Sequence, residues 1–239
     1  IGGDKEIPYL HLAHEANPFL GIRGLRLALD HRELLVTQLR AIARAGAVAN
    51  VRPRVMAPMV TTVEDVAMLH ALADEAQVSL GVQGTSSDAG FELGIMVEVP
   101  SSALCARELA GDVAFLSIGS NDLTQYVMAI DRTHARLAPF ANALHPAVLR
   151  LIRMTVEGAD EAGIPVAVCG ELAGDVAGAL VLVGLGVDEL SMDAGSLDEV
   201  RAALRSVSVA ELEALAATAL AARTAAEVRA AADALLESR

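Results

Sequence analysis

Several residue types are scarce in this chain of 239 residues, and each scarcity excludes a class of protein. Tryptophan is absent and aromatic residues make up only 3% of the sequence, so a core must be built from Ala, Val and Leu side chains. The two cysteines, Cys105 and Cys169, are too few to form a disulfide framework. Such sparse cysteine is typical of a reduced compartment, and we expect a cytoplasmic protein.

Long apolar segments are also missing. No apolar run reaches the roughly 18 residues that a membrane helix requires, and the apolar stretch at 177–187 is interrupted by glycines. No secretory signal is recognisable at the start of the chain. We therefore expect no insertion into a membrane. Because the chain begins at Ile1 rather than Met, we also expect it to be part of a longer protein.

Basic residues are outnumbered by acidic ones. The 18 Lys and Arg residues stand against 31 Asp and Glu residues, which gives a net charge of -13. Nucleic acid is excluded as a partner, because a phosphate backbone requires a basic surface. A small anionic substrate remains compatible, since a few Arg side chains and a divalent cation can reverse the field inside one cleft.

Predicted strands and helices alternate along the chain. Alternation of this kind predicts a parallel sheet with helices outside it, although the pattern does not distinguish an open sheet from a closed barrel. No linker rich in Pro, Gly or Ser divides the sequence, so we expect one domain over 1–239. The predicted strands are 51–59, 93–100, 113–119, 163–169 and 184–192, and the predicted helices are 31–45, 61–77, 101–109, 123–130, 145–162, 175–183, 196–204, 208–222 and 224–236.

Local signals set the expected ends of these helices. Asp30 is expected to cap the helix at 31–45, and Gly46 is expected to end it. The Gly- and Ser-rich residues 78–90 predict a loop. Three pairs have the spacing of capping boxes: Thr61/Glu64, Ser208/Glu211 and Thr224/Glu227.

The stretch at 115–126 concentrates the chemistry. An apolar strand ends at Gly119-Ser120 and delivers Asn121 and Asp122 side by side, immediately before a helix. In α/β enzymes, reactive side chains are placed at the carboxyl ends of strands in this way. The alternative reading is an ordinary strand-to-helix loop in which Asp122 caps the helix.

The residues at the ends of the neighbouring strands favour a functional site over an ordinary loop. Glu98 lies near the end of the preceding strand and Cys169 at the end of the following one, and the carboxyl ends of parallel strands share one rim. Glu98 and Asp122 are two hard oxygen donors suited to Mg²⁺ or Mn²⁺. Arg23 and Arg132 are expected near the rim, where a guanidinium can fork onto a phosphate. Cys169 is a candidate acid or nucleophile.

Six stretches of the sequence match one known family in order and spacing: 1–9, 17–23, 94–100, 117–126, 130–132 and 169–175. Together they resemble the carboxyl-terminal half of Enzyme I, the phosphoenolpyruvate–protein phosphotransferase of the bacterial sugar phosphotransferase system. Pyruvate phosphate dikinase and phosphoenolpyruvate synthase share the Asn-Asp-Leu-Thr-Gln core, but the first and last stretches are more similar to Enzyme I.

The resemblance implies a phosphoenolpyruvate-binding TIM (β/α)₈ barrel that forms a homodimer. It implies that Mg²⁺, or alternatively Mn²⁺, is held by Glu98 and Asp122. The site residues it implies are Arg132, Arg23 and Lys5 for the phosphate, Asn121 and Asp122 for the substrate, and Cys169 as the acid that protonates the enolate to give pyruvate.

The chain also departs from that family in extent. Only about five strands are predicted, so the first three of a barrel are expected to precede Ile1. The family's phosphorylated histidine and its docking segment for the small phosphocarrier protein lie in an amino-terminal half that this sequence does not include. We expect this piece alone to be incompetent for transfer. The alternatives are a dikinase or synthase fragment, or a non-catalytic dimerisation module.

Overall fold

The computed structural model describes residues 10, 14–82 and 90–239. It divides into two compact units, Ile1–Ile95 and Met96–Arg239, which are described separately below. Among the helices in the described part of the chain, none has the length and apolar character needed to cross a membrane.

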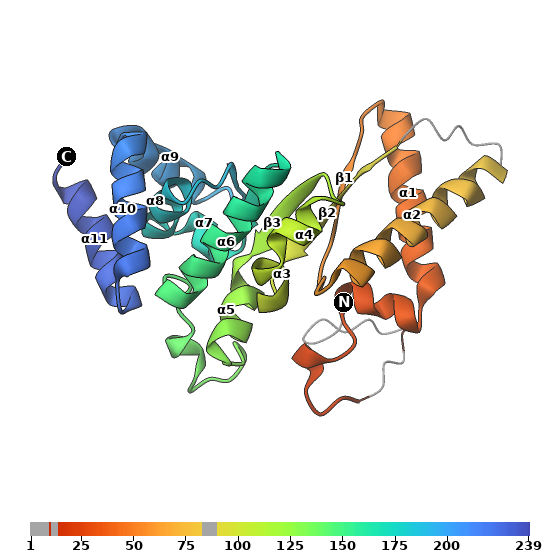
Figure 1. Ribbon diagram of the computed structural model, residues 1–239, viewed down its shortest axis with the longest axis horizontal. Coiled ribbons are helices and arrows are strands. Elements are labelled where there is room, and N and C mark those ends of the chain that lie inside the picture. Colours follow the sequence, from red (N-terminus) through yellow and green to blue (C-terminus); the bar gives the residue numbers. More distant parts are fainter. Residues whose placement is uncertain (1–9, 11–13, 83–89) are drawn as a thin grey trace. The chain divides into compact units, whose positions relative to one another are not determined.

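The first unit pairs two helices with two parallel strands (Figure 1). Strand β1 (Arg54–Ala57) runs parallel to β2 (Glu92–Val97), with Arg54 opposite Glu92 and Ala57 opposite Ile95. Helix α1 (Arg32–Ala49) packs against α2 (Val63–Val82). Two 3-10 helices, η1 (Pro18–Leu20) and η2 (Gly24–Leu29), precede α1.

Both expected ends of α1 are wrong. Asp30 does not cap the helix, because its own N–H bonds to Leu27 and closes η2; His31 occupies the cap position instead. Gly46 lies inside the helix, which ends at Asn50 in the left-handed conformation. A Cβ at Gly46 would stand 2.7 Å from Cδ of Pro53, so this glycine allows close packing rather than ending the helix.

Helix α2 also differs from its prediction at both ends. Its start is capped one residue later than expected: the Asp65 carboxylate accepts from the N–H of Thr62 at 3.1 Å, and the Asp65 N–H reaches Oγ1 of Thr62 at 3.4 Å. The helix then continues to Val82, so the loop predicted from residue 78 is wrong over its first residues. Leu80 is buried, and this apolar contact outweighs the local Gly and Ser signal. Residues 83–89 lie outside the described residues.

The second unit contains three parallel strands whose spatial order follows their order in the chain. Strand β3 (Phe115–Gly119) pairs with β4 (Val166–Cys169), and β4 pairs with the short β5 (Glu189–Leu190). Helices separate these strands in sequence, so the prediction of an α/β fold with a parallel sheet is confirmed. Sequential neighbours of this kind are the arrangement of a (β/α) barrel.

Ten helices are described in this unit, and several begin directly after a strand (Figure 1). The predicted helix 101–109 is broken at Cys105, and the segment after Cys169 forms a short turn of helix before α8. The capping box of Ser208 and Glu211 is confirmed. The helices are α3 (Pro100–Leu104), α4 (Ala106–Ala110), α5 (Ser120–Met128), η3 (Ala138–Phe140), α6 (Pro146–Ala162), α7 (Glu171–Gly174), α8 (Val176–Gly184), α9 (Leu197–Ser206), α10 (Val209–Ala221) and α11 (Ala225–Glu237).

The core of the second unit is aliphatic, as the composition predicts. Leu116 and Ile118 of β3, Ile152 of α6 and Leu180 of α8 are all fully buried. Helix α8 is apolar on nearly every side because α10 and α11 cover it (Figure 1). This packing anchors β3 and β4, whose carboxyl ends carry the candidate site.

Candidate functional site

The register of β3 and β4 brings two of the predicted site segments together. Gly119, the last residue of β3, lies opposite Cys169, the last residue of β4. Each strand passes directly into a helix, α5 after Gly119 and α7 after Gly170. Asn121, Asp122 and Cys169 therefore lie at the same edge of the sheet, as parallel strands require.

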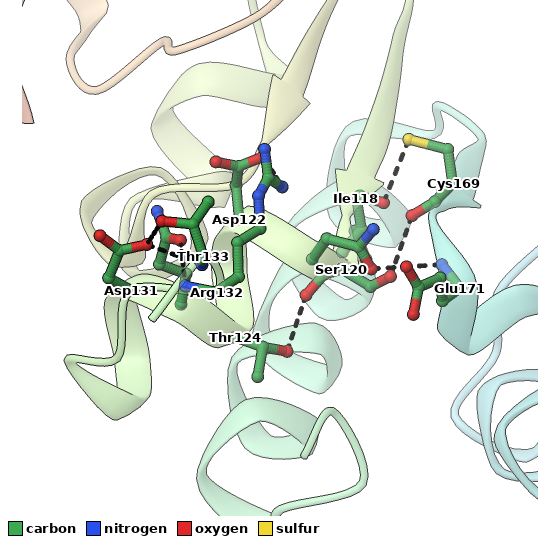
Figure 2. Close-up of polar contacts among 11 residues, drawn as sticks. Ile118, Ser120, Asp122, Thr124, Asp131, Arg132, Thr133, Cys169 and Glu171 are labelled. Atoms are coloured by element: carbon green, nitrogen blue, oxygen red, sulfur yellow. Dashed lines mark hydrogen bonds and ion pairs between the residues drawn. The ribbon is translucent and has the colours of Figure 1, made fainter. Parts of the chain in front are cut away.

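Asp122 and Arg132 form an ion pair at this edge (Figure 2). Nη1 of Arg132 donates to Oδ2 of Asp122 at 3.1 Å, and the Asp122 residue is only 9% exposed. The backbone of Arg132 is held as well, because its N–H donates to Oε1 of Gln125 at 3.0 Å. Two contacts thus fix an otherwise flexible guanidinium over α5.

The turn that carries Arg132 is stabilised by its neighbour. The Asp131 carboxylate accepts from the N–H and the hydroxyl of Thr133 at 2.8 and 2.7 Å. These hydrogen bonds hold the pKa of Asp131 below its ordinary value, with the Thr133 hydroxyl as the largest cause. The Asp131 carboxylate therefore stabilises this turn through its hydrogen bonds with Thr133.

Glu98 lies against the end of β3. It is 3% exposed, and a Cβ built on Gly119 would stand 3.0 Å from Cβ and 3.1 Å from Oε2 of Glu98. Gly119 therefore makes room for this carboxylate. The buried side chains of Glu98 and Asp122 thus both lie near the carboxyl end of β3.

The thiol of Cys169 is bonded to β3. Sγ donates to the carbonyl of Ile118 at 3.6 Å (Figure 2). The hydroxyl of Ser117 lies 3.6 Å from the same sulfur. These two contacts set the direction of the Cys169 side chain at the end of β4. Ser117 is 5% exposed, so its own side chain is buried, whereas Cys169 is partly exposed.

Asn121 reaches across to the segment that follows Cys169. Its Oδ1 accepts from the N–H of Glu171 at 3.2 Å. Because a backbone N–H can only donate, the carbonyl end of the Asn121 amide must face Glu171. The Nδ2 group, which is the donor end of the amide, therefore points away from the N–H of Glu171.

Two cavities open beside these residues, and both include Asn121, Glu171 and Asp175. One, of about 400 Å³, also includes Arg132 and Gln125. The other, of about 600 Å³, also includes Cys169, Ser191 and Asp193. The Cys169 thiol and the Arg132 guanidinium thus line adjacent cavities, each of a size for a small molecule.

Two predicted residues, Arg23 and Lys5, precede the second unit in the sequence. Arg23 belongs to the first unit, where it is 8% exposed and its guanidinium carbon stands 5.4 Å from the centre of the Phe19 ring. Lys5 lies outside the described residues. The geometry of the second unit therefore includes Glu98, Asn121, Asp122, Arg132 and Cys169.

The donor set at the strand ends suits a hard divalent cation. Within the described part of the chain, no cluster of three or more His, Cys, Asp or Glu side chains is arranged to hold a metal. Glu98 and Asp122 supply two buried carboxylates, and Mg²⁺ is commonly held by one or two carboxylates together with substrate oxygens. The residues present therefore fit such an ion bound jointly with an anionic substrate.

Sequence reasoning missed three residues at this edge: Ser117, Ser120 and Gln125. Each is at least nine-tenths buried and bonds to a neighbour that the sequence did single out. A signal was present, because polar side chains in and directly after a buried strand need partners. The pattern could not name those partners, which come from β4 and from the loop after α5.

The chain was compared with protein families and with individual proteins. Residues 1–209 match the family model described as "PEP-utilising enzyme, PEP-binding domain". The chain belongs to this family. The match covers the first unit and the second unit as far as Val209, the first residue of α10, and it includes every predicted site residue from Lys5 to Cys169.

Relatives in this family include longer proteins. A multiphosphoryl transfer protein of Rhodobacter capsulatus is 51% identical over 96% of this chain, which spans 27% of that protein. A phosphoenolpyruvate-protein phosphotransferase of Haemophilus influenzae is 44% identical over 95% of this chain, which spans 39% of that protein. The resemblance stated from the sequence is thereby confirmed, and the chain spans well under half the length of these relatives.

Among solved structures, a citrate lyase from Burkholderia xenovorans superimposes with a TM-score of 0.53. The match covers 87% of this chain and 68% of that one, at 18% sequence identity. This likeness supports the α/β fold.

Proposed function

We propose that this domain binds phosphoenolpyruvate together with a divalent cation and releases pyruvate after the phosphoryl group has passed to a histidine outside the chain. The observation that supports it most is the convergence of two buried carboxylates, a guanidinium held by an ion pair and a thiol bonded to β3 at the ends of neighbouring strands. The family match concerns phosphoenolpyruvate binding, and the relatives' names favour a phosphotransferase over a dikinase.

Glu98 and Asp122 would hold the cation, which we take to be Mg²⁺ or Mn²⁺. When bound, such an ion supplies Lewis-acid stabilisation of negative charge on substrate oxygens. Both carboxylates are buried, so the protein sets their position before the ligands arrive. The ion pair with Arg132 compensates part of the charge of Asp122 meanwhile.

Arg132 would bind the phosphoryl group. Its side chain is 27% exposed, so an oxygen of the substrate can reach the guanidinium beside Asp122. Arg23 and Lys5 are proposed as further phosphate ligands. For Asn121 we propose that Nδ2 is the substrate-side donor, because Oδ1 accepts from Glu171.

Cys169 would complete the reaction. Cleavage of the bridging P–O bond leaves the electron pair on the enolate oxygen of the substrate. The Cys169 thiol then gives its proton to carbon 3, which forms the methyl group of pyruvate, and the resulting thiolate regains a proton from solvent. The Ser117 hydroxyl, 3.6 Å from Sγ, would stabilise the transient thiolate.

The partners follow from the same proposal. The phosphoryl acceptor would be a histidine in another part of the intact protein, which would pass the group to a small phosphocarrier protein. We further propose a homodimer in the cytoplasm. Sedimentation at several concentrations would measure the assembly, and a single species with the monomer mass throughout would contradict the dimer.

The central experiment is calorimetric titration of phosphoenolpyruvate into the intact protein, with Mg²⁺ and with a chelator. We expect binding with Mg²⁺ and its loss in chelator. Phosphohistidine formation from radiolabelled phosphoenolpyruvate then tests transfer. Absence of binding in the presence of Mg²⁺ would contradict the proposed function.

A further inference from the structure

Ser120 makes an unusual connection for the first residue of a helix. Serine at a helix start commonly caps that helix, but α5 has no side-chain cap. Instead, Oγ of Ser120 donates to the carbonyl oxygen of Cys169 at 3.0 Å, on the neighbouring strand (Figure 2). Ser120 is 0% exposed, so it cannot touch a substrate in the adjoining cavities.

Ser120 is itself held in place. Its carbonyl accepts from the hydroxyl of Thr124 one helical turn later, at 2.7 Å. The backbone of Ser120 and the start of α5 are therefore braced from within the helix. Because its backbone is held, the Ser120 hydroxyl can fix the position of the group to which it donates.

The segment after Cys169 is bonded on both sides of Gly170. Ser120 holds the carbonyl before Gly170, and Oδ1 of Asn121 holds the N–H of Glu171 after it. Gly170 has a φ of 105°, in the region that favours glycine, and a Cβ there would stand 2.5 Å from Oγ of Ser120. We call these contacts among Ser120, Asn121 and residues 169–171 the β3–β4 clasp.

The clasp fixes the backbone from which the thiol projects. Cys169 is the last residue of β4, where the ladders to β3 and β5 end, and the clasp holds its carbonyl just beyond them. Without Ser120, the carbonyl of Cys169 loses its bond and the end of the strand can shift. A misplacement of about 1 Å at a reacting group can reduce a rate by about a hundredfold.

We propose that Ser120 is a positioning residue that aims the Cys169 thiol at carbon 3 of the enolate. The proposal rests on the function proposed above for Cys169. Ser120 transfers no proton itself; the proton moves from Sγ to carbon 3, and solvent restores it. The class of step that depends on Ser120 is thus enolate protonation, and phosphoryl transfer does not depend on it.

The test uses three substitutions in the intact protein: Ser120→Ala, Ser120→Thr and Ser120→Val. Thr and Val have nearly the same shape, and only Thr keeps the hydroxyl. Rapid-quench single turnovers measure phosphohistidine and pyruvate separately. Thr155→Val is the matched control, because Thr155 is also fully buried and donates to Leu151 at 2.9 Å, within α6.

We expect every variant to form phosphohistidine at a rate close to that of the unsubstituted protein. Pyruvate formation should slow by about tenfold to a hundredfold in Ser120→Ala and Ser120→Val, and Ser120→Thr should restore it. Equal slowing in Thr and Val, unchanged pyruvate formation in Ala, or equal slowing in the Thr155 control would overturn the proposal. If the unsubstituted protein forms no phosphohistidine, the proposed function itself fails.

Discussion

Nη1 of Arg132 lies 3.1 Å from Oδ2 of Asp122, so the proposed phosphate ligand and the proposed metal ligand are bonded to each other. Both groups are largely withdrawn from water, which strengthens the pairing. The pair would keep the proposed site for an anion and a cation preformed in a chain with a net charge of -13. Each charge stabilises the other until ligands replace part of that interaction.

Removal of the charge of either carboxylate should weaken the Mg²⁺-dependent binding of phosphoenolpyruvate. Glu98→Gln and Asp122→Asn keep the shape of each side chain and remove its charge. We expect phosphoenolpyruvate affinity in Mg²⁺ to fall by at least about a hundredfold, since even the outer partners of metal ligands are worth about 10- to 100-fold. Titration calorimetry with and without Mg²⁺ measures this.

Asp198→Asn is the control for that experiment. Its carboxylate is in α9, is 99% exposed and pairs only loosely with Arg201 at 3.8 Å. It should bind phosphoenolpyruvate with unchanged affinity and metal dependence. Retention of Mg²⁺-dependent binding in both Glu98→Gln and Asp122→Asn would show that these two carboxylates do not hold the ion.

Removal of the thiol should affect the last step alone. Cys169→Ala is expected to bind phosphoenolpyruvate normally and to form phosphohistidine, but pyruvate should appear at least about a hundredfold more slowly, because positioned acids contribute about 10² to 10⁴ in rate. Rapid quench with separate measurement of phosphohistidine and pyruvate distinguishes the steps. Cys105→Ala, which removes the exposed cysteine, should behave as the unsubstituted protein. Full pyruvate formation by Cys169→Ala would assign the acid elsewhere.

The strand ends of the site could be predicted because they depend on a short-range pattern. An apolar strand that ends at Gly119 and is followed by three polar residues implies that their side chains lie at a carboxyl edge, and parallel pairing then aligns that edge with Cys169. The contacts themselves could not be predicted. Whether Arg132 reaches Asp122 depends on the path of the loop after α5, which Gln125 and Thr133 hold by hydrogen bonds.

The alternation of strands and helices could be predicted from the sequence, whereas several helix ends could not. Gly46 and residues 78–82 carry local signals for stopping a helix, yet both lie within helices in the structure. At these positions packing prevails: Gly46 lies against Pro53, and Leu80 is buried. Local propensity is worth about 1 kcal/mol or less per residue, so burial of one Leu side chain can override it.

Stability in acid should depend on the capping box of α10. Glu211 accepts from the N–H and the hydroxyl of Ser208 at 2.9 and 2.7 Å, and it also pairs with Arg239. The backbone hydrogen bond from Ser208 is the largest cause that lowers the pKa of Glu211 from 4.5 to about 2. A lowered folded-state pKa contributes stability above pH 4.5, and that contribution is lost as the pH falls through about 2.

Glu211→Gln should therefore be less stable than the unsubstituted protein at neutral pH, and the difference should narrow as the pH falls from 4.5 towards 2. Urea denaturation across that range measures the difference. Glu213→Gln, an exposed carboxylate in the same helix, should show no such narrowing. A difference for Glu211→Gln that stays constant with pH would contradict the assignment. Ser208→Ala should cost about 1 kcal/mol at neutral pH by removing the cap.

Close packing of α8 against α10 should depend on one glycine. A Cβ at Gly184 would stand 2.0 Å from the carbonyl oxygen of Leu212, a backbone atom that cannot move aside without shifting α10. Gly184→Ala is therefore expected to destabilise the protein by about 3 kcal/mol, at the upper end of overpacking. Gly111→Ala is the control, because its Cβ would meet nothing closer than 3.8 Å, and its stability should change by no more than about 0.5 kcal/mol. Urea denaturation measures the stability of both variants. Equal stabilities of Gly184→Ala and Gly111→Ala would mean that α8 and α10 can separate at little cost in free energy.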